Sequence, residues 1–331
     1  MQNYRVSIHQ EAKSVVEESP FPSRKEDEVI LNVKACGICG SDVPRIFANQ
    51  AYYYPIVIGH EFSGLVVDSE NGDLNGKRVG IFPIIPCKEC EFCKQGKYAN
   101  CANYNYYGSR CDGGMQEYLA IKTENLVELP DNVSYEVGAM LEPVSVCLHA
   151  VKKAEIQDGE DVLIYGAGTI GLLCAMWAKD FGAENIYLVD IDEKKLDFAE
   201  NLGFKRYNGE SVQVVFECSG AGVCLNKAIE NVDAFGRIVL VGNANGDMVV
   251  QVGNYAKVLR KQLTIVGSWN SDFSLAVNDW EESVKAISEE RIHPSALITH
   301  IISLRDWEQV INVIKNREFF NKIMVVNNDE C

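Results

Sequence analysis

Residues 161–190 read DVLIYGAGTIGLLCAMWAKDFGAENIYLVD, and this stretch decides the fold of the second half of the chain. An apolar run ends in the pattern G-A-G-T-I-G, which opens a segment with helical spacing. A second apolar run then ends at Asp190, nineteen residues beyond Gly171. The glycine pattern alone is weak, but between a strand and a helix it predicts a dinucleotide-binding unit.

The residues of this turn have separate physical tasks. Gly166 makes the tight turn, Gly168 allows the pyrophosphate to approach, and Gly171 permits close packing of helix on strand. The N-terminus of the helix then faces the phosphate. The residues predicted to bind the cofactor are Gly166, Gly168, Thr169, Ile170, Gly171 and Asp190.

Asp190 indicates which dinucleotide is bound. Its carboxylate is placed to accept hydrogen bonds from the ribose hydroxyls and would repel a 2′-phosphate, which favours NAD over NADP. The alternative for Asp190 is a solvated acid at a strand end. Asp192 and Lys195 lie close enough in the sequence to modify the preference.

The same alternation continues toward the C-terminus. A second helical segment at 193–203 is followed by three buried strands, VQVVFECSG, GRIVLVG and LTIVGS, which indicates a parallel, doubly wound sheet. Only RYNGES separates the second helical segment from VQVVFECSG, so we predict a shortened connection there.

Up to about Ala150 the chain instead has short strand-like runs with glycine and proline between them, typical of a β-rich, barrel-like domain. The tail from about Trp280 reads helix, strand, helix, strand, and we expect it to return to this first domain.

Composition excludes several classes of function. The chain has 31 Lys and Arg residues and 47 Asp and Glu residues, and the resulting net charge of −16 repels nucleic acid and anionic membrane surfaces. The N-terminus has no apolar secretory segment, and the longest apolar runs are far too short to span a bilayer. We therefore expect a cytoplasmic protein with a small-molecule substrate, in which disulfides are disfavoured for the twelve cysteines.

Four of these cysteines form a metal-binding pattern. Cys87, Cys90, Cys93 and Cys101 have the spacing C-x2-C-x2-C-x7-C, and four thiolates without an open position are typical of a structural zinc site. An iron–sulfur cluster is disfavoured, because the bacterial ferredoxin run ends in x3-C-P and Cys101 is followed by alanine. Four unrelated thiols remain the alternative.

Three separated pieces have the composition of an open zinc site. They are Cys39 in ACGICGSD, the pair His60–Glu61 in IGHEFSG, and Glu142 in LEPVSVCLHA. Three protein ligands would leave one position for water or substrate. Each piece alone has a simpler interpretation, as a buried thiol, a core histidine or a helix N-terminal acid. Cys36 also makes a C-x-x-C with Cys39, and we interpret it as structural.

The order of these motifs resembles that of the zinc-containing medium-chain dehydrogenases of the alcohol and sorbitol dehydrogenase type. The similarity includes ACGICGSD, IGHEFSG, the four-cysteine loop, LEPVSVCLHA, GAGTIG and the LITHIIS tail. It implies a GroES-like catalytic domain over residues 1–150 and 270–331, which holds a catalytic and a structural zinc. It also implies a Rossmann NAD-binding domain over 151–269. The segments CGSDVPRIF, YYYPIVIGHEFSG and LRKQLTIVGSW are most similar to the galactitol-phosphate type.

The resemblance implies roles for individual residues. Cys39, His60 and Glu142 would hold the catalytic zinc, and Glu61 would be an alternate ligand. Asp42 would accept a hydrogen bond from the far ring nitrogen of His60. Ser41 would hydrogen-bond the alcohol and pass its proton outward. Many relatives place a histidine of the proton relay where this chain has Pro44, so the relay must pass through ribose and water or through another residue.

The resulting hypothesis is hydride transfer between NAD and a sugar alcohol, favouring a polyol phosphate such as galactitol 1-phosphate, which would give the keto-sugar phosphate. A phosphorylated substrate needs a cation, for which Arg45 and Arg110 are the candidates; a solvated or ion-paired arginine is the alternative for each. A zinc dehydrogenase of the sorbitol or L-iditol, threonine or ribulose-5-phosphate type is the alternative enzyme. A non-catalytic dinucleotide-binding zinc protein is the alternative outside enzymes. The family commonly forms dimers or tetramers, so we expect a homodimer or homotetramer.

Overall fold

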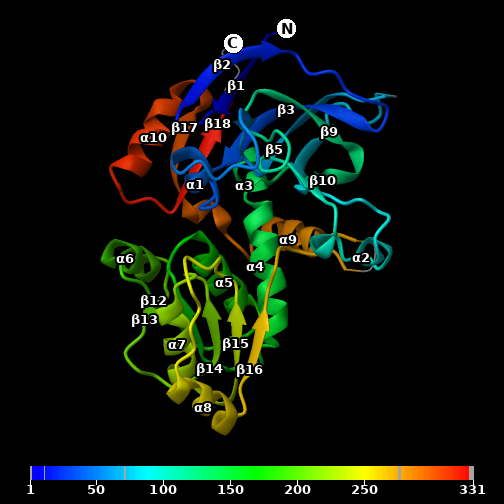
Figure 1. Cartoon of the computed structure of the whole chain (residues 1–331). Coiled ribbons are helices and arrows are strands. Elements are labelled where there is room, and N and C mark those ends of the chain that lie inside the picture. The colour runs from blue at the N-terminus through cyan, green and yellow to red at the C-terminus, as the bar shows by residue number, and fades with distance from the viewer. Residues whose placement is uncertain (1, 11, 71, 275–276, 328–331) are drawn as a thin grey trace. The chain divides into compact units, whose positions relative to one another are not determined.

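The computed structural model describes residues 2–10, 12–70, 72–274 and 277–327, and the chain divides into two compact units (Figure 1). Unit 1 comprises Met1–Glu142, Asp272–Glu290 and Pro294–Cys331, and unit 2 comprises Pro143–Ser271 and Arg291–His293. The sequence suggested boundaries near 150 and 270, whereas the first boundary of the structure falls within helix α4 (Leu141–Ala154). Because the helix continues from one unit into the other, no turn residue marks this boundary.

Unit 1 is built around strand β3 (Glu28–Gly37), most of whose residues are buried. It pairs antiparallel with β5 (Glu61–Asp68), β9 (Tyr118–Lys122) and β18 (Lys322–Val326). The seven-stranded sheet has the order β10-β6-β5-β3-β18-β17, with β9 also on β3, and a second sheet has the order β2-β1-β4. The C-terminal tail therefore returns to the first unit, as predicted.

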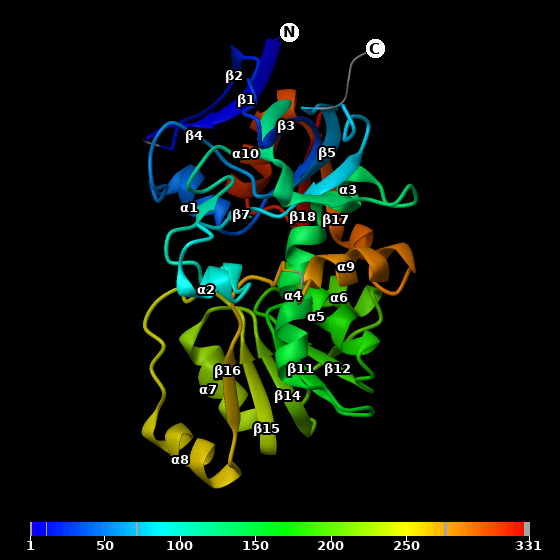
Figure 2. The same ribbon diagram turned by 90° about the vertical axis from the view of Figure 1, so that its right-hand side faces the viewer.

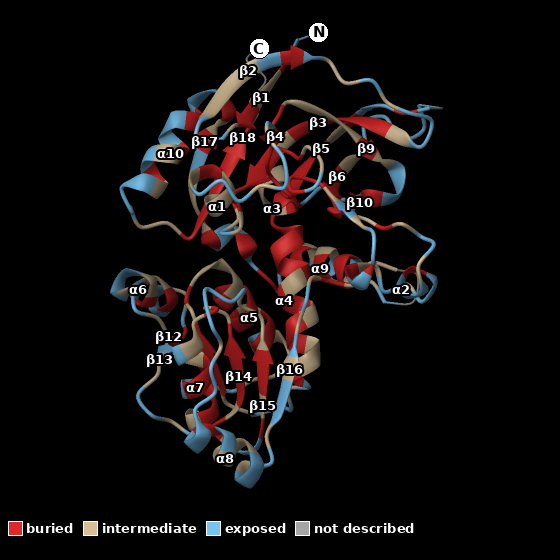
Figure 3. Cartoon of the chain, in the orientation of Figure 1, coloured by how far each residue is buried: buried red, intermediate tan, exposed pale blue. Residues whose placement is uncertain are grey.

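Unit 2 contains a six-stranded parallel sheet in the order β13-β12-β11-β14-β15-β16. The strand order reverses direction at β11 (Val162–Tyr165). Since parallel crossovers are right-handed, helices α5 and α6 cover one face of the sheet and α7 and α8 the other (Figures 1 and 2). Between β13 (Lys205–Arg206) and β14 (Val212–Glu217) there is no helix, which confirms the predicted shortened connection. The central strands are buried, whereas α8 is largely exposed (Figure 3).

The remaining elements complete the two units (Figure 1). In unit 1 they are β1 (Gln2–Ile8), β2 (Ser14–Pro20), α1 (Asp42–Phe47), β4 (Ile56–Val57), β6 (Arg78–Ile81), β7 (Ile84–Ile85), α2 (Glu91–Lys94), β8 (Asn105–Tyr106), β10 (Leu126–Glu128), α3 (Tyr135–Ala139), α9 (Asp279–Ser288), β17 (Ile298–Ser303) and α10 (Trp307–Lys315). In unit 2 they are α5 (Thr169–Asp180), β12 (Ile186–Val189), α6 (Glu193–Asn201), α7 (Gly222–Asn231), β15 (Val232–Leu240), α8 (Val252–Lys261) and β16 (Thr264–Gly267). Across the described ranges, no helix combines the length and the apolar character that a membrane crossing requires.

Candidate active site

Cys39, His60 and Glu61 form a compact group in unit 1. Their ligand atoms all lie within 4.8 Å of one another. The pairing of β3 with β5 brings them together, because Gly37 lies opposite Glu61 and Cys39 follows two residues later. A Cβ atom on Gly37 would lie 2.3 Å from Glu61 Oε2, so a larger residue here would require the Glu61 carboxylate to move.

A lysine from the last strand neutralises Glu61. Lys322 Nζ donates to Glu61 Oε2 at 2.6 Å and to the carbonyl oxygen of Ile38 at 3.1 Å. The side chains of Lys322 and Glu61 are only 3% and 2% exposed. No sequence pattern indicates this pair, because Lys322 begins an ordinary apolar strand at the far end of the chain.

His60 is surrounded by negative groups. Its Nδ1 atom lies 3.7 Å from Asp42 Oδ1 and makes no hydrogen bond to any described residue. Burial lowers the pKa of His60, but the Cys39 thiolate and the carboxylates of Asp42 and Glu142 outweigh it and raise the pKa to about 10. Asp42 therefore faces one ring nitrogen of His60, at a distance longer than a hydrogen bond.

Glu142 lies near this group at the first turn of α4, although it does not belong to the set within 4.8 Å. Burial raises the pKa of Glu142 to about 7, with a contribution from Glu61 and an opposing one from His60. Tyr106, whose ring contacts the His60 ring edge-on at 5.6 Å, donates its hydroxyl to Glu142 Oε1 at 3.2 Å. Tyr106 was not among the predicted site residues, because tyrosine carries no metal-ligand signal.

Ser41 and Asp42 share one arginine. Arg45 Nη1 donates to Asp42 Oδ1 at 2.9 Å and to Ser41 Oγ at 3.3 Å, and Nη2 donates to Ser109 Oγ at 3.1 Å. The Arg45 side chain is 14% exposed. Asp42 also accepts from the Cys39 backbone N–H at 3.1 Å. Arg45 therefore organises the residues next to the metal-ligand candidates, and its guanidinium group is already engaged.

Arg110 has a different environment. Its guanidinium carbon lies 4.8 Å from the ring centroid of Tyr52 and 4.4 Å from that of Tyr104, and the residue is exposed. The structure thus separates the two arginines that the sequence offered for a substrate phosphate.

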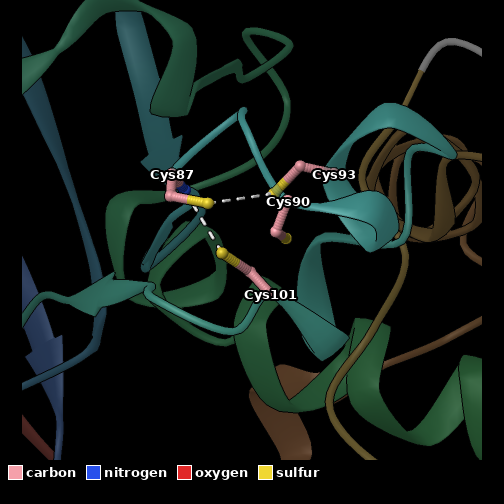
Figure 4. A group of neighbouring side chains, drawn as sticks. All are labelled: Cys87, Cys90, Cys93 and Cys101. Atoms are coloured by element: carbon pink, nitrogen blue, oxygen red, sulfur yellow. Dashed lines mark hydrogen bonds between the residues drawn. The ribbon is translucent and has the colours of Figure 1, made fainter.

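The four predicted structural-zinc cysteines converge in a loop of unit 1 (Figure 4). All four sulfur atoms lie within 4.8 Å of one another, and Cys87 Sγ is 4.0 Å from Cys93 Sγ. Backbone N–H groups of Ala102 and Cys93 lower the pKa of Cys90 to about 6. Burial raises the pKa of Cys93 to about 12, so the four thiols do not share one environment. Four convergent thiols are the donor set that a structural zinc ion binds.

The glycine-rich turn of unit 2 connects β11 to α5. Gly166 has a φ of +102°, and a Cβ on Gly171 would lie 1.8 Å from the Gly166 carbonyl oxygen. Gly168 is the N-cap residue of α5, has an extended backbone conformation and makes no side-chain capping hydrogen bond. Asp190 follows β12 and accepts from the backbone N–H groups of Ala167 at 2.8 Å and Asp192 at 2.9 Å.

Comparison with known proteins identifies the family. Residues 25–131 match the alcohol dehydrogenase GroES-like domain, and residues 169–289 match the zinc-binding dehydrogenase family. Galactitol 1-phosphate 5-dehydrogenase of Escherichia coli (strain K12) is 35% identical, over 94% of this chain and 96% of that protein. The chain belongs to the zinc-type medium-chain alcohol and polyol dehydrogenases.

Other members of the family support this assignment. Sorbitol dehydrogenase of Bombyx mori is 30% identical over 99% of each chain. The crystal structure of galactitol-1-phosphate dehydrogenase from Escherichia coli superposes with a TM-score of 0.91 at 34% identity and covers 98% of this dehydrogenase and 99% of that chain. The predicted fold class, a GroES-like domain with a Rossmann domain, is confirmed.

The residues present in this dehydrogenase fit a catalytic zinc ion. Thiolate, imidazole and carboxylate are all good zinc ligands, and here the half-buried Cys39 converges with the buried His60 and Glu61. The unpartnered Nδ1 of His60 and the raised pKa of its ring show an excess of negative charge that a divalent cation would neutralise.

Proposed function

We propose that this dehydrogenase uses zinc and NAD to transfer a hydride between a polyol phosphate and the nicotinamide ring. The observation that carries the proposal is the convergence of the half-buried Cys39 with the buried His60 and Glu61 in unit 1. Unit 2 of the same chain carries the glycine turn and Asp190. The similarity to galactitol 1-phosphate 5-dehydrogenase favours galactitol 1-phosphate as the substrate, which would yield the keto-sugar phosphate.

In this proposal Cys39, His60 and Glu142 hold the catalytic zinc, and Glu61 is the alternate ligand that Lys322 retains when it is not bound to the metal. When bound, the ion would supply a Lewis acid that lowers the pKa of the substrate hydroxyl. The four cysteines at 87–101 hold the second, structural zinc.

Ser41 is the residue that receives the substrate proton. Because Arg45 donates to Ser41 Oγ, one of the two lone pairs of that oxygen is occupied. The second lone pair accepts from the substrate hydroxyl, and the Ser41 hydroxyl proton is passed to ribose or water. Pro44 offers no group for this step. Asp42 faces His60 Nδ1 and fixes the ring orientation.

The cofactor is held by the glycine turn of unit 2. The N–H groups at the start of α5, including those of Thr169 and Ile170, face the pyrophosphate. Each oxygen of Asp190 accepts one backbone N–H and retains a lone pair for a ribose hydroxyl. This acceptor-only group supports our assignment of NAD rather than NADP.

We further propose self-association through the edge of the unit 2 sheet. β16 is an edge strand on which Ile265 is exposed, and α8 exposes Val252, Tyr255 and Leu259. Exposed apolar groups beside an open strand edge are typical of a subunit interface, so we expect a homodimer or homotetramer. All described cysteines are free thiols, which a reducing cytoplasm would preserve.

A spectrophotometric screen of NAD reduction tests the function. The wild-type chain and Cys39→Ser are assayed with phosphorylated and free polyols, and metal content is measured in parallel. We expect turnover with the wild type, two zinc ions per chain, and a loss of about 10³-fold or more in the variant, since a Lewis acid contributes several kcal/mol. Near-normal turnover by Cys39→Ser would remove zinc from the mechanism.

A further inference from the structure

We propose that Arg110, held by the rings of Tyr52 and Tyr104, is the residue that binds the phosphate of the substrate. This inference rests on the proposed function and adds to it the group that distinguishes a phosphorylated polyol from a free one. The first step is the contrast between the two arginines near the site. The guanidinium group of Arg45 is occupied by Asp42, Ser41 and Ser109, so that a phosphate would have to displace a buried ion pair.

The second step is that Arg110 has no carboxylate partner among the described residues. Seven other arginines of this acidic chain each pair with an Asp or Glu: Arg5, Arg24, Arg45, Arg206, Arg237, Arg291 and Arg305. Arg110 contacts tyrosine rings instead. Such contacts use the face of the guanidinium group and leave the N–H donors at its edge for an anion.

The third step is that nearby acids are engaged elsewhere. Asp112, two residues after Arg110, accepts from the Val57 backbone N–H at 3.0 Å and from the Tyr53 hydroxyl at 3.3 Å. Its other oxygen lies 4.0 Å from Arg5 Nη1. The positive charge of Arg110 is therefore not cancelled by the carboxylate closest to it in the sequence.

The fourth step connects Arg110 to the reacting end of the site. The ring centroids of Tyr104 and Tyr106 are 6.2 Å apart, and those of Tyr106 and His60 are 5.6 Å apart. The Tyr106 hydroxyl donates a hydrogen bond to Glu142. A continuous row of rings thus runs from Arg110 to the metal-ligand candidates. A substrate that is oxidised at one end and phosphorylated at the other needs two recognition points on one surface. The metal-ligand candidates would bind the hydroxyl that is oxidised, and Arg110 would bind the phosphate.

Tyr52 restricts the motion of the Arg110 side chain. Tyr52 is 68% exposed, and the Arg110 guanidinium lies over its ring. The ring contacts restrict the guanidinium group before a ligand arrives, so less side-chain entropy is lost when a phosphate binds. Arg110 can then bind phosphate with two parallel hydrogen bonds, which lysine cannot do.

The experiment compares substrates within each variant. The ratio of kcat/KM for a hexitol 1-phosphate to that for the free hexitol is measured with NAD for the wild type, Arg110→Met, Arg110→Lys and Tyr52→Leu. A general loss of activity cancels in this ratio. We expect Arg110→Met to lower it by about 10- to 100-fold, the value of a charge-assisted hydrogen-bond pair, mainly through KM for the phosphate ester. Arg110→Lys should recover part of the loss, and Tyr52→Leu should lower the ratio a few-fold.

Arg305 provides the matched control, because it is also an arginine that lies over a tyrosine ring, that of Tyr4, and it pairs with Glu117. Arg305→Met should leave the ratio at its wild-type value. An Arg110→Met ratio equal to that of the wild type, or a wild type that does not prefer the phosphate ester, overturns the proposal.

A binding measurement separates this inference from the proposed function. If the wild type oxidises no polyol, the proposed function fails, and calorimetric titration of hexitol 1-phosphate into the zinc-loaded chain still tests Arg110. Binding that weakens about tenfold or more in Arg110→Met supports the site, and unchanged binding refutes it. Inorganic phosphate, titrated in the same way, shows whether the phosphate group alone is recognised; competition between it and the hexitol 1-phosphate is expected, and independent binding would contradict a shared site.

Discussion

Replacing Lys322 by methionine should weaken unit 1 most when zinc is absent. Lys322 and Glu61 are almost fully buried, and the change leaves the Glu61 carboxylate without its cation and the Ile38 carbonyl oxygen without its donor. Breaking a buried ion pair from one side costs about 3–5 kcal/mol. In the zinc-loaded protein the metal offers Glu61 another positive neighbour, so that the cost should be smaller by several-fold.

Hydrogen–deuterium exchange of peptides from β3, β5 and β18 measures this locally, and it does not require that the whole chain unfolds in two states. Zinc-free Lys322→Met should exchange faster in these strands by about two orders of magnitude or more, since 1.36 kcal/mol corresponds to a factor of ten. Lys285→Met is the control, because Lys285 makes only a surface pair with Glu289 and its loss should cost less than about 1 kcal/mol.

The pair Glu61→Gln and Lys322→Met completes the test as a double-mutant cycle. If the two residues stabilise one another, the double variant will exchange more slowly than the sum of the single effects predicts. Additive effects, or a Lys322→Met variant that behaves like Lys285→Met, would refute the reasoning. Equal damage with and without zinc would show that Glu61 does not reach the metal.

Three further predictions concern the other parts of the molecule. Cys101→Ser should reduce the zinc content from two ions to one and lower the melting temperature, measured by elemental analysis and calorimetry; retention of both ions would contradict the four-thiol site. Asp190→Ala should raise KM for NAD about tenfold and reduce the preference for NAD over NADP, whereas Asp190→Asn, which keeps one acceptor oxygen, should do less. Because burial raises the pKa of Glu142 to about 7, zinc-free protein should lose stability as the pH rises from about 4.5 to 7, and Glu142→Gln should remove this loss in pH-dependent melting curves; an unchanged pH profile would contradict the burial of that carboxyl.

Local patterns explain why so much of the fold and site was accessible from the sequence. The glycine turn needs particular backbone conformations at adjacent positions, and only glycine adopts the φ of +102° at Gly166 at low cost. The four-cysteine loop is also local, since its spacing alone lets the thiols converge. Cys39 and His60 are farther apart, but the motif order of the family located both.

Residues whose roles depend on distant pairing could not be predicted. Lys322 reaches Glu61 only because β18 pairs with β3 at the opposite end of the chain, and no local pattern encodes that contact. The difference between Arg45 and Arg110 depends on which side chains surround each guanidinium group. The place of Tyr106 in the site could be recognised only from the structure, in which its ring contacts that of His60.

The charges around the metal-ligand candidates explain why a phosphate needs a separate binding residue. With zinc bound as we propose, His60 would be neutral and Cys39 would be a thiolate. Cys39, Asp42, Glu61 and Glu142 would then carry four negative charges, against two positive charges on Lys322 and Arg45. The deficit of two charges is what a divalent ion would neutralise. A doubly charged phosphate brought to the same place would restore the excess of negative charge at the point where the substrate hydroxyl must lose its proton. Binding the phosphate at Arg110, beyond the row of tyrosine rings, keeps that charge away from the reacting hydroxyl while it still selects the substrate.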